Sequence, residues 1–182
     1  MNYKNEPYPE NLSALLTLAD QLSSRILMHL NSPNCKKVGD LYNVINGKII
    51  RDKKQFEELG YTPNESNEFK GLYIFGEEVD GRVIPVYVGI SRTIYRRLRQ
   101  HAWGKRHNEC TLAYLKTSLK WEIDGRKPGR ATITNEDMLP AKSIIQNYKV
   151  VLVEVQNDYD LYFLEVILAG KFKSKWNSFK TH

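Results

Sequence analysis

Three residues stand out because their types and spacing could act on a phosphate ester. Arg97 and His101 are four residues apart, so on a helix they would lie on one face. A guanidinium suits two-point recognition of a phosphate, although an arginine at such a position is usually just solvent-exposed. Glu165 lies in the apolar segment LYFLEVILAG, where a carboxylate is costly unless it is paired or bound to a cation. A structural salt bridge and a cation site are therefore both open for Glu165.

Two tyrosines in neighbouring apolar segments could supply proton transfer. Tyr73 belongs to GLYIF (71–75) and Tyr87 to VIPVYVG (83–89), whose β-branched and aromatic residues are typical of strands. Strand tyrosines are usually core residues, and a phenol acts as a base only if a cation lowers its pKa from about 10. His101 is the rival base because its ordinary pKa is closer to neutral. We assign the base to Tyr73 and its hydrogen-bonded support to Tyr87.

The turn between these segments decides whether the two tyrosines share a face of the sheet. A two-residue turn at 80–81 places them on opposite faces, because a shift of one residue exchanges the faces of a strand. A three-residue loop at 79–81 instead pairs Tyr73 with Tyr87, and we predict this register. The same register pairs two glycines that allow close backbone approach at the strand ends, Gly71 and Gly89.

The order of these residues resembles the GIY-YIG nuclease family. Five features occur in the family's order: GLY (71–73), YVG (87–89), Arg97 with His101 one helical turn later, Glu165, and Asn177. The resemblance covers roughly residues 68–182, and its strength lies in the order and spacing of the features, since GLY or YVG alone would mean little. The segment LEVILAGKFKSKWN (164–177) departs from the family in one respect, because Trp176 precedes Asn177 where a proline is common.

The resemblance implies a metal-dependent DNA endonuclease that hydrolyses phosphodiester bonds and leaves 5′-phosphate and 3′-hydroxyl ends. Glu165 would be the metal ligand, and Mg²⁺ is the natural ion for one carboxylate and several waters, with Mn²⁺ as a substitute. Asn177 would orient the phosphate or Glu165 by hydrogen bonds. The implied catalytic set is Tyr73, Tyr87, Arg97, His101, Glu165 and Asn177.

Basic residues are concentrated around these candidates. The chain has a formal net charge of +6, yet residues 90–130 hold eleven Lys and Arg against three acidic residues, and residues 171–182 add four lysines without an acid. This asymmetry favours a polyanionic partner, although a solvated helix face can have the same composition. We expect DNA contacts from Arg92, Arg96, Arg99, Lys105, Arg106, Arg126, Lys127, Arg130, Lys173 and Lys175.

Hydrophobic periodicity predicts an α/β (α+β) fold, a small three-stranded antiparallel sheet flanked by helices, like that of the GIY-YIG domain. The third strand is KVVLVEV (149–155), and residues 34–50 are ambiguous. The expected helices are 10–31, 51–60, 93–103 capped by Ser91 or Thr93, 109–123, 136–148, and 160–171 capped by Asp158 or Asp160. The last of these helices is apolar on every side, which predicts that it is buried.

Two domains are predicted, an N-terminal helical extension (1–66) and the nuclease-like domain (67–182) with an insertion at about 104–148. The insertion carries basic residues and would clamp or read DNA, or else form a packed helix pair with an idle loop. The extension would pack beside the catalytic domain, extend the DNA surface, or mediate a homodimer. A zinc site at His101, His107 and Cys110 is disfavoured because a fourth ligand is missing.

Composition narrows the cellular setting. The sequence has no apolar stretch of membrane-spanning length and no signal-peptide pattern, and its two cysteines do not form a disulfide framework, so we expect an intracellular, cytoplasmic protein. Within the GIY-YIG resemblance, a stand-alone restriction-type or defence nuclease is favoured. The alternatives are a structure-directed repair or recombination nuclease, a toxin nuclease, and a non-catalytic nucleic-acid-binding module on the same scaffold.

Overall fold

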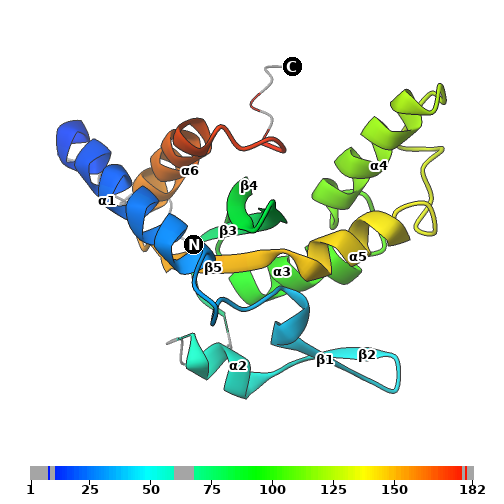
Figure 1. Cartoon of the computed structure of the whole chain (residues 1–182), viewed down its shortest axis with the longest axis horizontal. Helices are drawn as coiled ribbons and strands as arrows, with labels where there is room; N and C mark the ends of the chain where they lie inside the picture. Colours follow the sequence, from blue (N-terminus) through cyan, green and yellow to red (C-terminus); the bar gives the residue numbers. More distant parts are fainter. Residues whose placement is uncertain (1–7, 9–10, 60–67, 178, 180–182) are drawn as a thin grey trace. The chain divides into compact units, whose positions relative to one another are not determined.

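The computed structural model describes residues 8, 11–59, 68–177 and 179, and these form two compact units (Figure 1). Unit 1 comprises residues up to 35 together with 69–94 and 149–182, and unit 2 comprises 36–68 and 95–148. The predicted boundary between residues 66 and 67 does not coincide with these units. None of the helices in the described ranges is long and apolar enough to cross a bilayer.

Unit 1 is a three-stranded antiparallel sheet covered on one face by two helices. The predicted sheet is confirmed, with the strand order β4-β3-β5. Leu72 and Ile74 of the central strand point into a core shared with both helices, in which Leu22 and Leu164 are also buried. The opposite face of the strands carries Tyr73. The elements are α1 (Leu12–Leu30), β3 (Gly71–Val79), β4 (Arg82–Ser91), β5 (Lys149–Glu154) and α6 (Asp158–Phe172).

The predicted hairpin register is wrong, but the two tyrosines still share a face. Residues 80–81 form a two-residue turn in which both φ angles are positive, as in a type I′ turn. A β-bulge beyond Phe75 then shifts the pairing, so that Phe75 lies opposite Tyr87 and Tyr73 lies opposite Gly89. Because Tyr73 and Phe75 are two residues apart, Tyr73 lies on the same face as Tyr87. The bulge thus has the effect that we had assigned to a longer loop.

Helix α6 differs from its prediction at its start and on its outer side. The Asn157 side chain caps it by accepting hydrogen bonds from the N–H groups of Tyr159 and Asp160, so neither Asp158 nor Asp160 is the cap. The expectation of burial on every side is also wrong, since Tyr162 is 62% exposed. An apolar helix at the edge of a small core buries one stripe and leaves the rest in water.

Unit 2 contains a hairpin that periodicity did not resolve. Asn46 and Gly47, both with positive φ, form a two-residue turn between two short strands within the ambiguous segment 34–50. Pro140 lies in the first turn of its helix, where its missing N–H is not needed. The elements are the 3₁₀ helix η2 (Gly39–Leu41), β1 (Tyr42–Ile45), β2 (Lys48–Arg51), α2 (Lys53–Glu58), nearly all of α3 (Ile94–Trp103), α4 (Thr111–Ile123) and α5 (Leu139–Asn147).

Candidate active site

The Tyr73 and Tyr87 rings lie close together in unit 1, with centroids 6.1 Å apart. Phe75 completes the group, 5.3 Å from Tyr73 and 5.9 Å from Tyr87. Tyr73 is 1% exposed and Tyr87 is half buried, so the second phenol is the more accessible of the two. The Tyr73 ring and hydroxyl lie directly over Gly89, where a Cβ atom would overlap them. Gly89 is therefore required by the packing of Tyr73.

Replacing Gly89 with alanine is expected to destabilise the protein by about 1–3 kcal/mol, because the Tyr73 ring must move to make room. Gly170→Ala is the matched control. Gly170 lies in α6 with open space around its missing side chain, and alanine there should stabilise by about 0.5–1 kcal/mol. Chemical denaturation of both variants measures the two effects. Equal stability of the two variants would contradict the described position of Tyr73.

Helix α6 places Glu165 beside the core of unit 1, and none of the described residues forms an ion pair with it. Leu161, Leu164 and Leu168, on the buried side of the helix, belong to the core. Desolvation raises the pKa of the half-buried Glu165 carboxyl to about 7. Within the described residues, no hydrogen bond or ion pair involves its carboxylate, so the structural salt bridge left open by the sequence is not found. A partly desolvated oxygen ligand of this kind fits a hard divalent cation with water as its other ligands.

The raised pKa of Glu165 predicts that the metal-free protein becomes less stable as the pH rises. Folding raises this pKa from 4.5 to about 7, so the folded state binds the proton more tightly than the unfolded state. The contribution is fully present below pH 4.5 and is lost as the pH rises through about 7. We expect a loss of about 1–2 kcal/mol, less than the full shift implies because the group is partly exposed. Thermal unfolding in EDTA between pH 4.5 and 8 measures it, and Glu165→Gln should flatten that part of the profile.

Asn177 binds the free edge of β4. Its Oδ1 accepts a hydrogen bond from the Val88 N–H at 2.8 Å, and its Nδ2 donates to the Val88 carbonyl at 2.7 Å. Ser174 donates to the same Oδ1 at 2.7 Å, and the Trp176 N–H donates to the Val86 carbonyl at 3.0 Å. The segment after α6 therefore continues the hydrogen bonding of the sheet. Both side-chain hydrogen bonds of Asn177 with Val88 hold the strand that carries Tyr87, and no hydrogen bond between Asn177 and Glu165 occurs among the described residues.

Arg97 and His101 lie on one face of α3, and both are engaged within unit 2. Arg97 Nη1 donates to the Glu109 carbonyl at 2.9 Å, and its side chain is half buried. The His101 ring is fully buried, and its pKa lies well below the ordinary value, first because of burial and then because of the Arg97 charge. His101 is therefore neutral near pH 7, and its burial makes it a poorer candidate than the half-buried Tyr87 for activating a water molecule.

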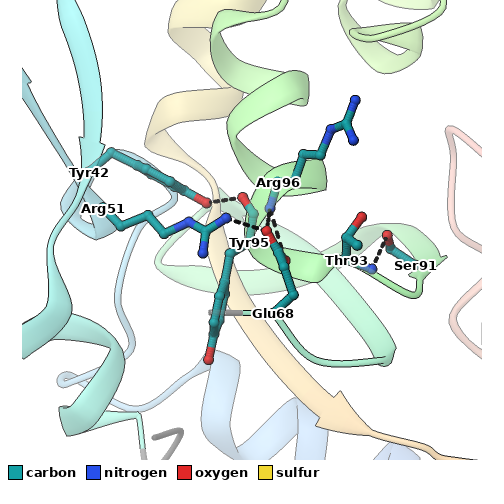
Figure 2. A network of polar contacts seen from close by, with 7 residues as sticks. All are labelled: Tyr42, Arg51, Glu68, Ser91, Thr93, Tyr95 and Arg96. Carbon is teal, nitrogen blue, oxygen red and sulfur yellow. Dashed lines mark hydrogen bonds and ion pairs between the residues drawn. The ribbon is translucent and has the colours of Figure 1, made fainter. Parts of the chain in front are cut away.

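A polar network fixes the start of α3 (Figure 2). Glu68 accepts hydrogen bonds from the Arg96 N–H at 3.1 and 3.3 Å and forms an ion pair with Arg51. The Tyr42 hydroxyl donates to the Tyr95 carbonyl. A carboxylate at this helix end also complements the helix dipole. Glu68 has no local signature as a cap in the sequence, because it precedes the helix by more than twenty residues and lies in a polar segment.

The start of α3 differs from the prediction that Ser91 or Thr93 caps the helix. The Ser91 hydroxyl accepts a hydrogen bond from the Thr93 N–H at 3.0 Å, just before the helix begins. The side-chain acceptor for the first turn is Glu68, described above.

All ten basic residues predicted to contact DNA are exposed. Some are also held in place within their own unit. Arg92 forms an ion pair with Asp158, and the Arg126 guanidinium stacks on the Trp121 ring, 3.5 Å from its centroid. Stacking leaves the N–H edges of a guanidinium available for phosphate. The predicted insertion contains the helices α4 and α5 joined by a basic loop, and both interpretations of this segment stay predictions.

Unit 1 therefore contains Tyr73, Tyr87, Glu165 and Asn177, and unit 2 contains Arg97 and His101. Over the described part of the chain, no group of three or more His, Cys, Asp or Glu side chains could hold a metal ion, so the predicted metal ligand Glu165 stands alone among them.

Comparison with known proteins finds one similar solved structure. No protein-family profile and no curated protein matches the chain. The structure is the GIY-YIG N-terminal endonuclease domain of UvrC from Thermotoga maritima, a point mutant bound to its catalytic divalent cation. It is 19% identical over 70% of this chain and 99% of that chain, with a TM-score of 0.35. The function proposed below rests on the chain's own side chains.

Proposed function

We propose that this protein is a divalent-metal-dependent endonuclease that hydrolyses phosphodiester bonds in DNA. The observation that carries the proposal is Glu165, a desolvated carboxylate with a pKa raised to about 7 and no partner among the described residues. Such a group costs stability, and a strongly perturbed acid often marks a functional site. Mg²⁺ fits this single oxygen ligand, and Mn²⁺ can replace it.

The other candidate residues supply the remaining needs of the reaction. When bound at Glu165, the cation would offset charge on the phosphate and on the leaving 3′ oxygen. Arg97 would hold the phosphate, Tyr73 would take the proton from the attacking water, and Tyr87 would support it. Because Tyr87 is more accessible than Tyr73, it is the alternative residue for taking the proton from the attacking water. Asn177 would hold the strand that carries Tyr87 through its two hydrogen bonds with Val88.

DNA is the proposed substrate because exposed basic residues are abundant in both units. We further propose a restriction-type or defence nuclease that acts as a homodimer, in which each of two active sites cuts one strand. A structure-directed repair nuclease is the alternative. Sequencing the ends left on a digested plasmid or phage genome separates them, because a unique cut sequence indicates restriction and scattered ends indicate structure-directed cleavage.

Nicking of supercoiled plasmid tests the activity itself. We expect relaxed and linear products in Mg²⁺ or Mn²⁺ and none in EDTA. Intact plasmid under all these conditions, with a folded protein, would overturn the proposal.

A non-catalytic nucleic-acid-binding module is the second candidate. It is favoured by the Arg97 hydrogen bond to the Glu109 carbonyl, which gives this arginine a structural use. DNA binding without any Arg97-dependent nicking would support the module.

A further inference from the structure

A hollow of about 400 Å³ lies in unit 1 where the end of β4 meets the start of α6. One wall comes from the strand and the residue after it, and the other from the first two turns of the helix. Its lining residues are Ile90, Ser91, Arg92, Asp158, Leu161 and Tyr162. Arg92 is predicted above to contact DNA, and none of the predicted catalytic residues lines this space.

The polar side of the hollow is built around Asp158. The Lys70 ammonium approaches Asp158 Oδ1 at 3.0 Å, and Arg92 forms an ion pair with Oδ2. Two cations therefore face one carboxylate, which leaves a net positive charge at this wall. The Arg92 side chain remains 41% exposed, so its guanidinium is oriented by Asp158 and also reaches solvent. A fixed guanidinium of this kind suits a phosphate or a base edge.

The apolar side offers a ring for stacking. Leu161 forms a buried floor at 2% exposure, whereas the Tyr162 ring is 62% exposed. An exposed tyrosine beside a positively charged wall is the combination with which proteins bind unpaired nucleotides, because every base has a face that can stack on an aromatic ring.

The hollow lies next to Glu165 along the same helix. Asp158, Tyr162 and Glu165 are spaced four and three residues apart, so all three lie on one side of α6. Tyr162 and Glu165 are separated by a rise of about 4.5 Å along the helix axis. A nucleotide in the hollow would therefore be a close neighbour of a phosphate that contacts the cation proposed at Glu165.

We propose that this hollow binds an unpaired nucleobase of the DNA substrate, adjacent to the scissile phosphate, with the base stacked on Tyr162 and the sugar-phosphate held by Arg92. The inference rests on the proposed nuclease function and adds to it that one base next to the cut leaves its stack. A base that has left the duplex exposes a face and an edge, which Tyr162 and the polar wall can contact.

Binding of two short single strands in EDTA tests the base site without cleavage. The probes are a fluorescein-labelled oligodeoxythymidylate of eight nucleotides and an abasic strand of the same length, measured by fluorescence anisotropy with the full chain. The protein should bind the base-containing strand more tightly. Tyr162→Ala should weaken that binding by about 10-fold and leave the abasic strand unaffected, since stacking is lost and phosphate contacts remain.

Two variants control for structure. Tyr162→Phe keeps the ring and should retain the preference for bases. Phe163→Ala removes the next side chain, 42% exposed and outside the hollow, and should bind both strands as the unaltered protein does. The melting temperatures of the two Tyr162 variants should agree with that of the unaltered protein, because Tyr162 is mostly exposed.

Plasmid nicking in Mg²⁺ with the same proteins separates this inference from the proposed function. If the protein nicks DNA but Tyr162→Ala binds both strands normally, the base site is overturned and the nuclease stands. If base-dependent binding is lost in Tyr162→Ala but no divalent cation supports nicking, the base site stands and the nuclease is overturned. Absence of both binding and nicking overturns both.

Discussion

Replacing Glu165 with glutamine is expected to lower Mg²⁺-dependent DNA cleavage by about 10³-fold or more while making the protein more stable at pH 8. The loss follows because a metal ion contributes several kcal/mol of charge stabilisation to such a reaction and glutamine removes the anionic ligand. The gain in stability follows because a neutral amide of nearly the same shape avoids the cost of desolvating a carboxylate, whose pKa is raised to about 7 here. Opposite changes in activity and stability are the signature of a residue retained for function.

Three measurements check this prediction. Nicking rates give the activity, calorimetric titration with Mn²⁺ gives cation binding, and thermal unfolding at pH 8 gives stability. Glu122→Gln, an exposed glutamate on α4, is the control and should change none of them. A Glu165→Gln protein that nicks DNA at the normal rate would remove the main support for the proposed metal site. Lower stability together with normal activity would make Glu165 a structural residue.

The hairpin shows what sequence patterns can and cannot settle about this fold. Alternating β-branched and aromatic residues correctly predicted both strands and the antiparallel pairing. The bulge has no local signature in the sequence, although it determines which residues pair. At Gly76 the missing Cβ leaves room that the Leu30 and Val83 side chains occupy, and Leu30 is distant in sequence. A local pattern carries no information about such a neighbour.

In the candidate site, too, local features were predictable from the sequence and long-range contacts were not. An acid in an apolar segment is visible in the sequence, and Glu165 is indeed desolvated. The hydrogen bonds of Asn177 to Val88, and of Glu68 to the start of α3, join residues far apart in the chain and have no local signature. One missed signal was available, since Asn-Gly at 46–47 between apolar residues is typical of a tight hairpin turn.

The predicted domain boundary differs from the two observed units because each unit combines separate segments of the chain. The polar segment at residues 61–69 predicts a domain boundary only if each domain is continuous in sequence. Each unit instead combines separate segments, so that α1 shares a core with α6 although it belongs to the predicted extension. Composition marks linkers but does not say which distant segments pack together. The division into an extension and a nuclease-like domain stays a prediction.

Arg97→Ala is expected to reduce cleavage by about 10³-fold, far more than it reduces stability. A positioned arginine that stabilises charge on a transferring phosphate typically contributes about 10³–10⁵ in rate. Its structural uses include Nη1 hydrogen bonds to the Glu109 carbonyl at 2.9 Å and the Asn108 carbonyl at 3.5 Å, whose loss should cost about 1–2 kcal/mol. Arg97→Lys keeps the charge but not the two-point geometry, so it should recover stability better than activity.

The size of the activity loss relative to the stability loss decides between the two candidate functions. Nicking rates are measured well below the melting temperature of each variant, so that partial unfolding does not contribute. Arg25→Ala, an exposed arginine on α1 outside both predicted sets, serves as the control and should leave nicking and stability unchanged. If Arg97→Ala loses activity only to the extent that it unfolds, the guanidinium serves the fold alone. If the variant binds DNA normally but no longer nicks it, Arg97 acts on the phosphate during the reaction, and the non-catalytic module is excluded.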